Sequence, residues 1–122
     1  MIEKSIVAVD DSIIVLQTLE GILSDRYDFR GFSKAERALG YMEQFPPSLI
    51  ILDIEMPEMN GYELLEKIME NRALKGTPVI FLTSNNEKES VIKAVTYGAE
   101  AYVLKPINRN LLISKIEALL QK

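Results

Sequence analysis

The chain has 122 residues, of which 48% are hydrophobic and 26% are charged, and these values are typical of one globular domain. It contains no cysteine and no histidine, which excludes disulfides, zinc sites built from thiolates or imidazoles, and catalytic triads that need histidine. The net charge of -4 argues against direct binding of nucleic acid or of an anionic membrane surface. We therefore expect a single domain over residues 1–122, whose chemistry depends on carboxylates, hydroxyls and lysine.

The first half of the chain alternates apolar runs of strand length with amphipathic stretches of helix length, which is typical of βαβ units. The apolar run at residues 6–9 predicts a strand; it is too short for a signal peptide or a membrane span, and we expect a cytoplasmic protein. Ser12 is a natural N-cap for the first helix. Residues 27–32 alternate in polarity and predict an edge strand. A capping box of Ser33 and Glu36 predicts the start of the second helix, which two consecutive prolines would end.

The second half continues the same alternation. Three nearly continuous apolar runs predict strands that are buried on both faces, namely residues 49–52, 79–82 and 101–104. Helical spacing of apolar residues predicts a third helix after Gly61, a fourth from about Asn86 to Gly98 and a fifth after Asn108. Five strands and five helices in alternation indicate an α/β fold with a parallel sheet.

Polar residues follow the ends of four predicted strands. They are Asp10-Asp11, Asp53, Thr83 with Ser84, and Lys105 followed by Pro106. Because ligands bind at the carboxyl ends of strands in an open parallel sheet, we expect these side chains to converge at one edge. Carboxylates packed together repel each other unless a divalent ion or a lysine neutralises them, and Mg²⁺ prefers oxygen ligands of this kind. A carboxylate in such a site can also act as a covalent nucleophile.

Each of these residues also has an ordinary structural explanation. The acidic pair after the first run fits a helix N-terminus, where negative side chains interact favourably with exposed N–H groups. Taken singly, Thr83 fits a strand end, Lys105 a solvated surface and Tyr102 a half-buried strand position. Asp53 favours function more strongly, because a carboxylate that ends a buried apolar strand needs a partner or a role.

Five short motifs occur in order along the chain. They are Val9-Asp10-Asp11-Ser12, Leu52-Asp53-Ile54-Glu55-Met56-Pro57 leading to Met59-Asn60-Gly61, Leu82-Thr83-Ser84, Gly98-Ala99-Glu100-Ala101-Tyr102, and Lys105-Pro106. Each is weakly specific, but the ordered set is very specific, and over essentially its whole length the sequence resembles the receiver domains of two-component response regulators, including the stand-alone chemotaxis type. The resemblance implies a flavodoxin-like (βα)5 fold, with a doubly wound five-stranded parallel sheet in the order 2-1-3-4-5 and five helices.

The resemblance also implies a role for each site residue. Asp53 would be the phosphoacceptor, Lys105 would contact the phosphoryl oxygens, and Thr83 would hydrogen-bond the phosphoryl group. The implied cofactor is Mg²⁺, with Mn²⁺ as an alternative, and its implied ligands are Asp10, Asp11, Asp53 and the backbone carbonyl of Glu55.

The same resemblance implies a conformational switch and a means of timing it. Tyr102 would rotate inward as Thr83 is drawn towards the phosphate, and the bond between Lys105 and Pro106 would be cis. Glu55 lies two residues after the acceptor and Asn85 two residues after the threonine, at positions where the family varies its dephosphorylation rate.

The implied function is acceptance of a phosphoryl group from a sensor histidine kinase or a histidine phosphotransfer protein. The domain would catalyse this transfer and its own dephosphorylation, and it would signal through a face built from the fourth helix, fifth strand and fifth helix. Contact with nucleic acid or membrane is not expected, and both a monomer and a phosphorylation-dependent dimer fit the sequence. The kinase, the downstream target and any attached output domain stay open.

Three other functions fit parts of the sequence. A receiver-like module that binds partners without phosphorylation is the main alternative, although such a module is expected to lack part of the acidic cluster or the lysine. A small phosphatase with an aspartate nucleophile is suggested superficially by Asp53-Ile54-Glu55, but that class normally has a second aspartate and a longer chain. A flavodoxin-like electron carrier would need a phosphate-binding loop where Asp10-Asp11 stands.

Overall fold

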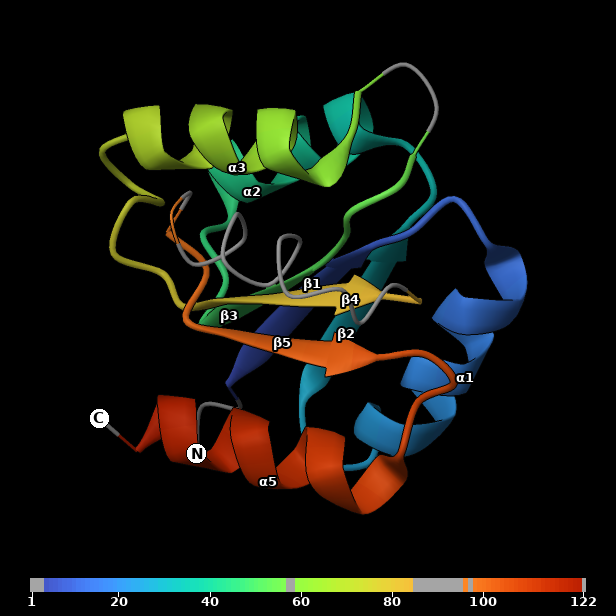
Figure 1. Cartoon of the computed structure of the whole chain (residues 1–122). Helices are drawn as coiled ribbons and strands as arrows, with labels where there is room; N and C mark the ends of the chain where they lie inside the picture. The colour runs from blue at the N-terminus through green and yellow to red at the C-terminus, as the bar shows by residue number, and fades with distance from the viewer. Residues whose placement is uncertain (1–3, 57–58, 85–95, 97, 122) are drawn as a thin grey trace.

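The computed structural model describes residues 4–56, 59–84, 96 and 98–121. Its five strands form one parallel sheet in the order β2-β1-β3-β4-β5, which confirms the predicted topology (Figure 1). The strands are β1 (Ser5–Val9), β2 (Asp28–Phe32), β3 (Leu49–Asp53), β4 (Val79–Thr83) and β5 (Ala101–Leu104). The four helices in the described part of the chain are α1 (Ile13–Leu23), α2 (Ala35–Gln44), α3 (Gly61–Glu70) and α5 (Arg109–Leu120). Most of the predicted fourth helix, residues 86–98, lies outside the described residues.

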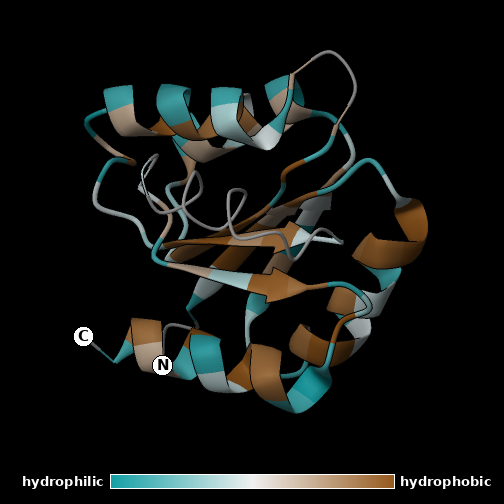
Figure 2. Cartoon of the chain, viewed as in Figure 1, coloured by the Kyte–Doolittle hydropathy of each residue, from teal (hydrophilic) through white to brown (hydrophobic). Residues whose placement is uncertain are grey.

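Helices cover both faces of the sheet. Figure 1 shows α2 and α3 on one side and α1 and α5 on the other. Successive residues of a strand point to opposite faces, so Val7 and Val9 pack with α2 and α3, whereas Ile6 and Ala8 pack with α1 and α5. Figure 2 shows the resulting concentration of hydrophobic residues in the strands. Burial on both faces explains the continuous apolar sequence of β3 and β4, in which all residues are buried.

The predicted edge strand lies at the edge. β2 pairs with β1 alone in the described sheet, and its side chains are half-buried or exposed. None of the helices in the described part of the chain combines the length and the apolar character that a membrane span requires.

Capping residues define the helix starts, and one prediction about them is wrong. The Ser12 side chain accepts a hydrogen bond from the Val15 N–H at 3.3 Å, as expected. Asn108, after which the fifth helix was predicted, caps α5 in the same way. Lys34, and not Ser33, is the N-cap of α2, and it makes no capping hydrogen bond through its side chain. The Ser33 and Glu36 pair is therefore one residue out of register with the helix, because a capping box joins the N-cap to the third helical residue.

A capping box does begin α3, at a position where the sequence analysis did not place one. The Asn60 Oδ1 accepts from the Glu63 N–H at 2.9 Å, and the Glu63 carboxylate accepts from the Asn60 N–H at 3.3 Å. This cap fixes the start of α3 next to the end of β3, where the polar residues gather.

Candidate functional site

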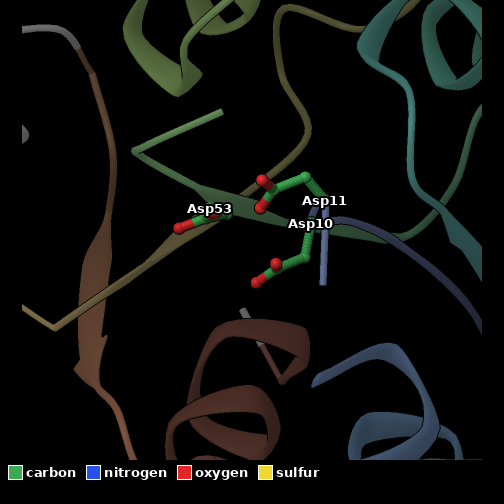
Figure 3. Close-up of side chains that lie close together, drawn as sticks. All are labelled: Asp10, Asp11 and Asp53. Atoms are coloured by element: carbon green, nitrogen blue, oxygen red, sulfur yellow. The ribbon is translucent and has the colours of Figure 1, made fainter. Parts of the chain in front are cut away.

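Three carboxylates meet at the carboxyl end of the central strands. Asp10 and Asp11 directly follow β1, and Asp53 is the last residue of β3. Figure 3 shows their side chains converging from these two strand ends. One oxygen from each carboxylate lies within 4.8 Å of the other two. The structure therefore brings together the acidic residues that the sequence placed at this edge.

Asp10 is the most deeply buried member of the cluster, with a relative exposure of 0%. Its Oδ1 accepts a hydrogen bond from the Ser12 N–H at 2.9 Å, so the start of α1 orients the carboxylate. Its Oδ2 is buried and accepts no hydrogen bond of good geometry from the described residues. That oxygen lies 3.0 Å from the Lys105 Nζ, and this contact is ionic. A buried carboxylate oxygen without a directed partner suits a cation ligand.

Lys105 bridges two of the acids. Its Nζ donates a hydrogen bond to the Asp53 Oδ1 at 3.2 Å while it contacts Asp10. Burial by itself would lower the pKa of Lys105, but the favourable interactions of its ammonium with the Asp10 and Asp53 carboxylates outweigh burial and raise it. Lys105 therefore stays protonated and supplies a fixed positive charge beside the Asp53 carboxylate.

Asp53 titrates unusually high for an aspartate. Burial, followed by the negative charge of Asp10, raises the pKa of Asp53 from 3.8 to about 6, against the opposing effects of Lys105 and of a hydrogen bond from the Glu55 backbone. The Asp53 residue is only 4% exposed, which accounts for the dominant effect of burial. One ammonium cannot balance three carboxylates, so the site without further cations holds an excess of negative charge. The acidic triad is consistent with a metal site.

The loop after Asp53 is packed against the strand end itself. The Gly61 N–H donates to the Ile54 carbonyl at 2.8 Å, which closes the loop. A Cβ at Gly61 would lie 2.4 Å from the Asp53 carbonyl oxygen and 2.9 Å from the Ile54 Cα. Glycine is thus required here by the close approach of two backbones, a requirement that the sequence analysis missed. The Glu55 side chain is exposed beside this loop, and Pro57 lies outside the described residues.

Thr83 and Tyr102 lie on one face of the sheet. Thr83 ends β4 and is 4% exposed, and the strand register pairs it with Leu104 and pairs Phe81 with Tyr102. Paired residues of neighbouring strands point to the same side, so Tyr102 shares the face of Thr83 and packs half-buried against the core under α2 and α3. Lys115 of α5 also contacts Tyr102, and no pattern in the sequence predicted this neighbour.

The peptide bond between Lys105 and Pro106 is cis, as the resemblance led us to expect. Asn85 lies outside the described residues, and the structure does not relate it to the acidic cluster.

Similarity to known proteins agrees with this site. The family model "Response regulator receiver domain" matches residues 6–117. The chain is 38% identical over 104 residues to the two-component response regulator ORR5 of Oryza sativa subsp. japonica, with 84% of this chain and 78% of that protein aligned. It is 31% identical over 120 residues to the response regulator Rre1 of Synechocystis, covering 97% of this chain and 52% of that protein.

Relatives differ in how much of their length the chain matches. The match to a Vibrio cholerae protein named "Probable cyclic di-GMP phosphodiesterase" is 36% identical and covers 96% of this chain but 26% of the relative. The chain thus spans about a quarter of the length of the Vibrio cholerae relative, about half of Rre1 and about three quarters of ORR5.

Solved structures show the same fold. The chemotaxis protein CheY4 of Vibrio cholerae superposes with a TM-score of 0.92 at 27% identity, covering 97% of this chain and 99% of that one. The BeF3-activated receiver domain of DrrB gives a TM-score of 0.90 at 30% identity, covering 99% and 100% of the two chains. With its acidic pocket, its lysine and its parallel sheet, the chain belongs to the response regulator receiver family, a family of signalling modules.

Proposed function

We propose that this receiver domain accepts a phosphoryl group on Asp53 from the phosphohistidine of a sensor histidine kinase or a histidine phosphotransfer protein. The observation that carries the proposal is the arrangement around Asp53, where a buried carboxylate receives a hydrogen bond from a lysine that is held between two acids. This geometry offers a nucleophile and a matched positive charge at the same point. Membership of a two-component family supports the class of partner.

The chemical step needs mainly positioning and charge compensation. A carboxylate oxygen of Asp53 attacks phosphorus, the new O–P bond forms, and the N–P bond to the donor imidazole breaks with its electron pair left on nitrogen. Lys105 is already hydrogen-bonded to Asp53 and places its ammonium next to the incoming phosphoryl oxygens. Asp10 holds Lys105 from the other side, so the ammonium needs little reorganisation.

Mg²⁺ fits the donor set of the pocket. Asp10, Asp11 and Asp53 supply hard oxygen ligands, and the Asp10 Oδ2 accepts no directed hydrogen bond from the described part of the chain. We assign the backbone carbonyl of Glu55 as a further ligand. When bound, the ion supplies positive charge that neutralises the carboxylates and the phosphoryl oxygens. Mn²⁺ suits the same ligands.

The switch that we propose follows from the shared face of Thr83 and Tyr102. Thr83 lies at the end of β4, and a phosphoryl group on Asp53 would draw its hydroxyl inward. This movement would leave space on the shared face, and the Tyr102 ring would fill it. Tyr102 is near enough because it precedes Leu104, the residue paired with Thr83, by two positions in β5. A downstream protein would then distinguish the two arrangements of the surface around β5 and α5. Either a monomer or a phosphorylation-dependent dimer can carry this signal.

Intact-mass measurement tests the proposal directly. The protein is incubated with acetyl phosphate or a phosphoramidate, with Mg²⁺ or with a chelator, alongside Asp53→Asn and the exposed control Asp25→Asn. We expect one added phosphoryl group that requires Mg²⁺, persists in the control and is absent from Asp53→Asn. No adduct, together with no response to beryllofluoride, would refute the proposal and favour an interaction module that works without phosphorylation.

Glu55 and Asn85 are proposed to set the lifetime of the phosphoryl group. Glu55 is exposed and lies two residues after Asp53, where its carboxylate can influence a water that attacks the phosphoryl group. The comparison of decay rates for the wild type, Glu55→Gln and Asn85→Ala tests this role. Equal decay rates in all three proteins would remove both residues from the mechanism.

A further inference from the structure

Lys115 of α5 makes two contacts with a single residue of β5. Its Nζ donates a hydrogen bond to the backbone carbonyl of Tyr102 at 2.9 Å. The same Nζ lies 5.1 Å from the centroid of the Tyr102 ring, within the range of cation–π attraction. Both side chains are half-buried, so water screens these contacts less than at a fully exposed site. One ammonium therefore contacts both the backbone and the ring of Tyr102.

The hydrogen bond lies at the outer edge of the sheet that the described strands form. β5 is the last strand in the sheet order and pairs with β4 on its other side. The Lys105 N–H donates to the Thr83 carbonyl of β4 at 2.8 Å. Backbone groups alternate in direction along a strand, so Tyr102 points its carbonyl away from β4. Lys115 thus satisfies an edge carbonyl and ties α5 to β5 at this residue.

The ring contact acts on the side chain that the proposed switch moves. The Tyr102 ring lies on the same face as Thr83 and packs against the core there. The backbone carbonyl does not move when the side chain changes its rotamer, so the ammonium stays at the present ring position when the ring leaves it. A partly exposed cation–π contact changes a rotamer population by about two- to fivefold.

We infer that Lys115 is a positioning residue that stabilises the resting position of Tyr102. The inference rests on the proposed function, because the ring position matters for signalling only if it responds to phosphorylation of Asp53. If the resting position is stabilised by Lys115, loss of the ammonium favours the alternative arrangement. By the reciprocity of coupled equilibria, a phosphoryl mimic should then bind more tightly by a similar factor.

The test compares three variants of the full chain. Lys115→Met keeps the length of the side chain and removes its charge and its donor, whereas Lys115→Arg keeps both. Lys67→Met, at an exposed position of α3, is the matched control. Scalar couplings measured by NMR give the χ1 population of Tyr102, and the ¹³C shift of its carbonyl reports the hydrogen bond. We expect Lys115→Met to change the χ1 population and the beryllofluoride affinity about two- to fivefold, Lys115→Arg to restore both, and the control to change neither.

Two results would overturn the inference. A changed carbonyl shift with an unchanged χ1 population in Lys115→Met would mean that Lys115 only caps the strand edge. If both the carbonyl shift and the χ1 population are unchanged, Lys115 neither caps the strand edge nor stabilises the ring position. Failure of the wild type to bind beryllofluoride would refute the proposed function instead, and the χ1 comparison would still decide the role of Lys115. If Lys115→Met does not fold, Lys115→Gln removes the charge, keeps a donor and allows the same comparison.

Discussion

Replacement of Asp53 by asparagine should stabilise the metal-free protein. Its pKa in the fold is about 6, compared with an ordinary value of 3.8. Each unit of that difference corresponds to about 1.4 kcal/mol, so the ionised carboxylate costs the fold about 3 kcal/mol at pH 8. Asparagine has nearly the same shape and no charge. We expect Asp53→Asn to raise the melting temperature at pH 8 by about 10 °C for a domain of this size.

The sign of the pH dependence makes the prediction specific. A raised pKa in the fold means that proton binding stabilises the fold fully below pH 3.8, and that this stabilisation is lost as the pH rises past about 6. The advantage of Asp53→Asn should therefore fall to about 0.5 kcal/mol at pH 4. Urea denaturation between pH 4 and pH 8 without divalent ions measures this difference in unfolding free energy from the wild type, with Asp25→Asn as the exposed control. A gain that is absent at pH 8, or equal at both pH values, would refute the reasoning.

Three further substitutions test individual parts of the site. Gly61→Ala should destabilise the fold by about 1–3 kcal/mol and slow phosphorylation, because its Cβ would meet the Asp53 backbone at 2.4 Å. Denaturant titrations measure the loss. Gly40→Ala is the control and should not destabilise the fold, because its Cβ would meet no atom within 4 Å. Lys105→Met should raise the pKa of Asp53 further, because the charge of Lys105 and its hydrogen bond both lower that pKa. ¹³C carboxyl shifts followed against pH measure the change, and an unchanged pKa would contradict the prediction. Asn60→Ala should cost about 1 kcal/mol in urea denaturation through loss of the α3 cap, while the Mg²⁺ dependence of phosphorylation stays the same.

The strands could be predicted because their environment leaves a strong local signal. Burial on both faces requires apolar residues at every position, as β3 and β4 show, and half-exposure of β2 produces its alternating pattern. Helix starts carry a weaker signal, since several residues near the start can serve as the N-cap. Lys34 occupies that position in α2, although Ser33 is the better capping residue type.

The sequence was sufficient to predict which polar residues at the strand ends form the candidate site. Parallel strands place their carboxyl ends at one edge, so the order of Asp10, Asp53 and Lys105 in the sequence was enough to bring them together. The contacts of Gly61 with the Asp53 backbone and of Lys115 with Tyr102 could not be predicted in this way. They depend on the distance between packed elements, and neither residue type signals such a contact by itself.

Lys105 connects the chemistry of the pocket to the strand that carries Tyr102. Its side chain is shared between Asp10 and Asp53, while its backbone N–H is bonded to the Thr83 carbonyl at 2.8 Å. A phosphoryl group on Asp53 changes the charge that this ammonium contacts, and the ends of β4 and β5 are joined at the same residue. Because the interior is close-packed, a displacement of Lys105 must be accommodated by Thr83 and by the strand that leads to Tyr102. The excess negative charge of the pocket and the movement of the signalling face are thus properties of one connected group of residues.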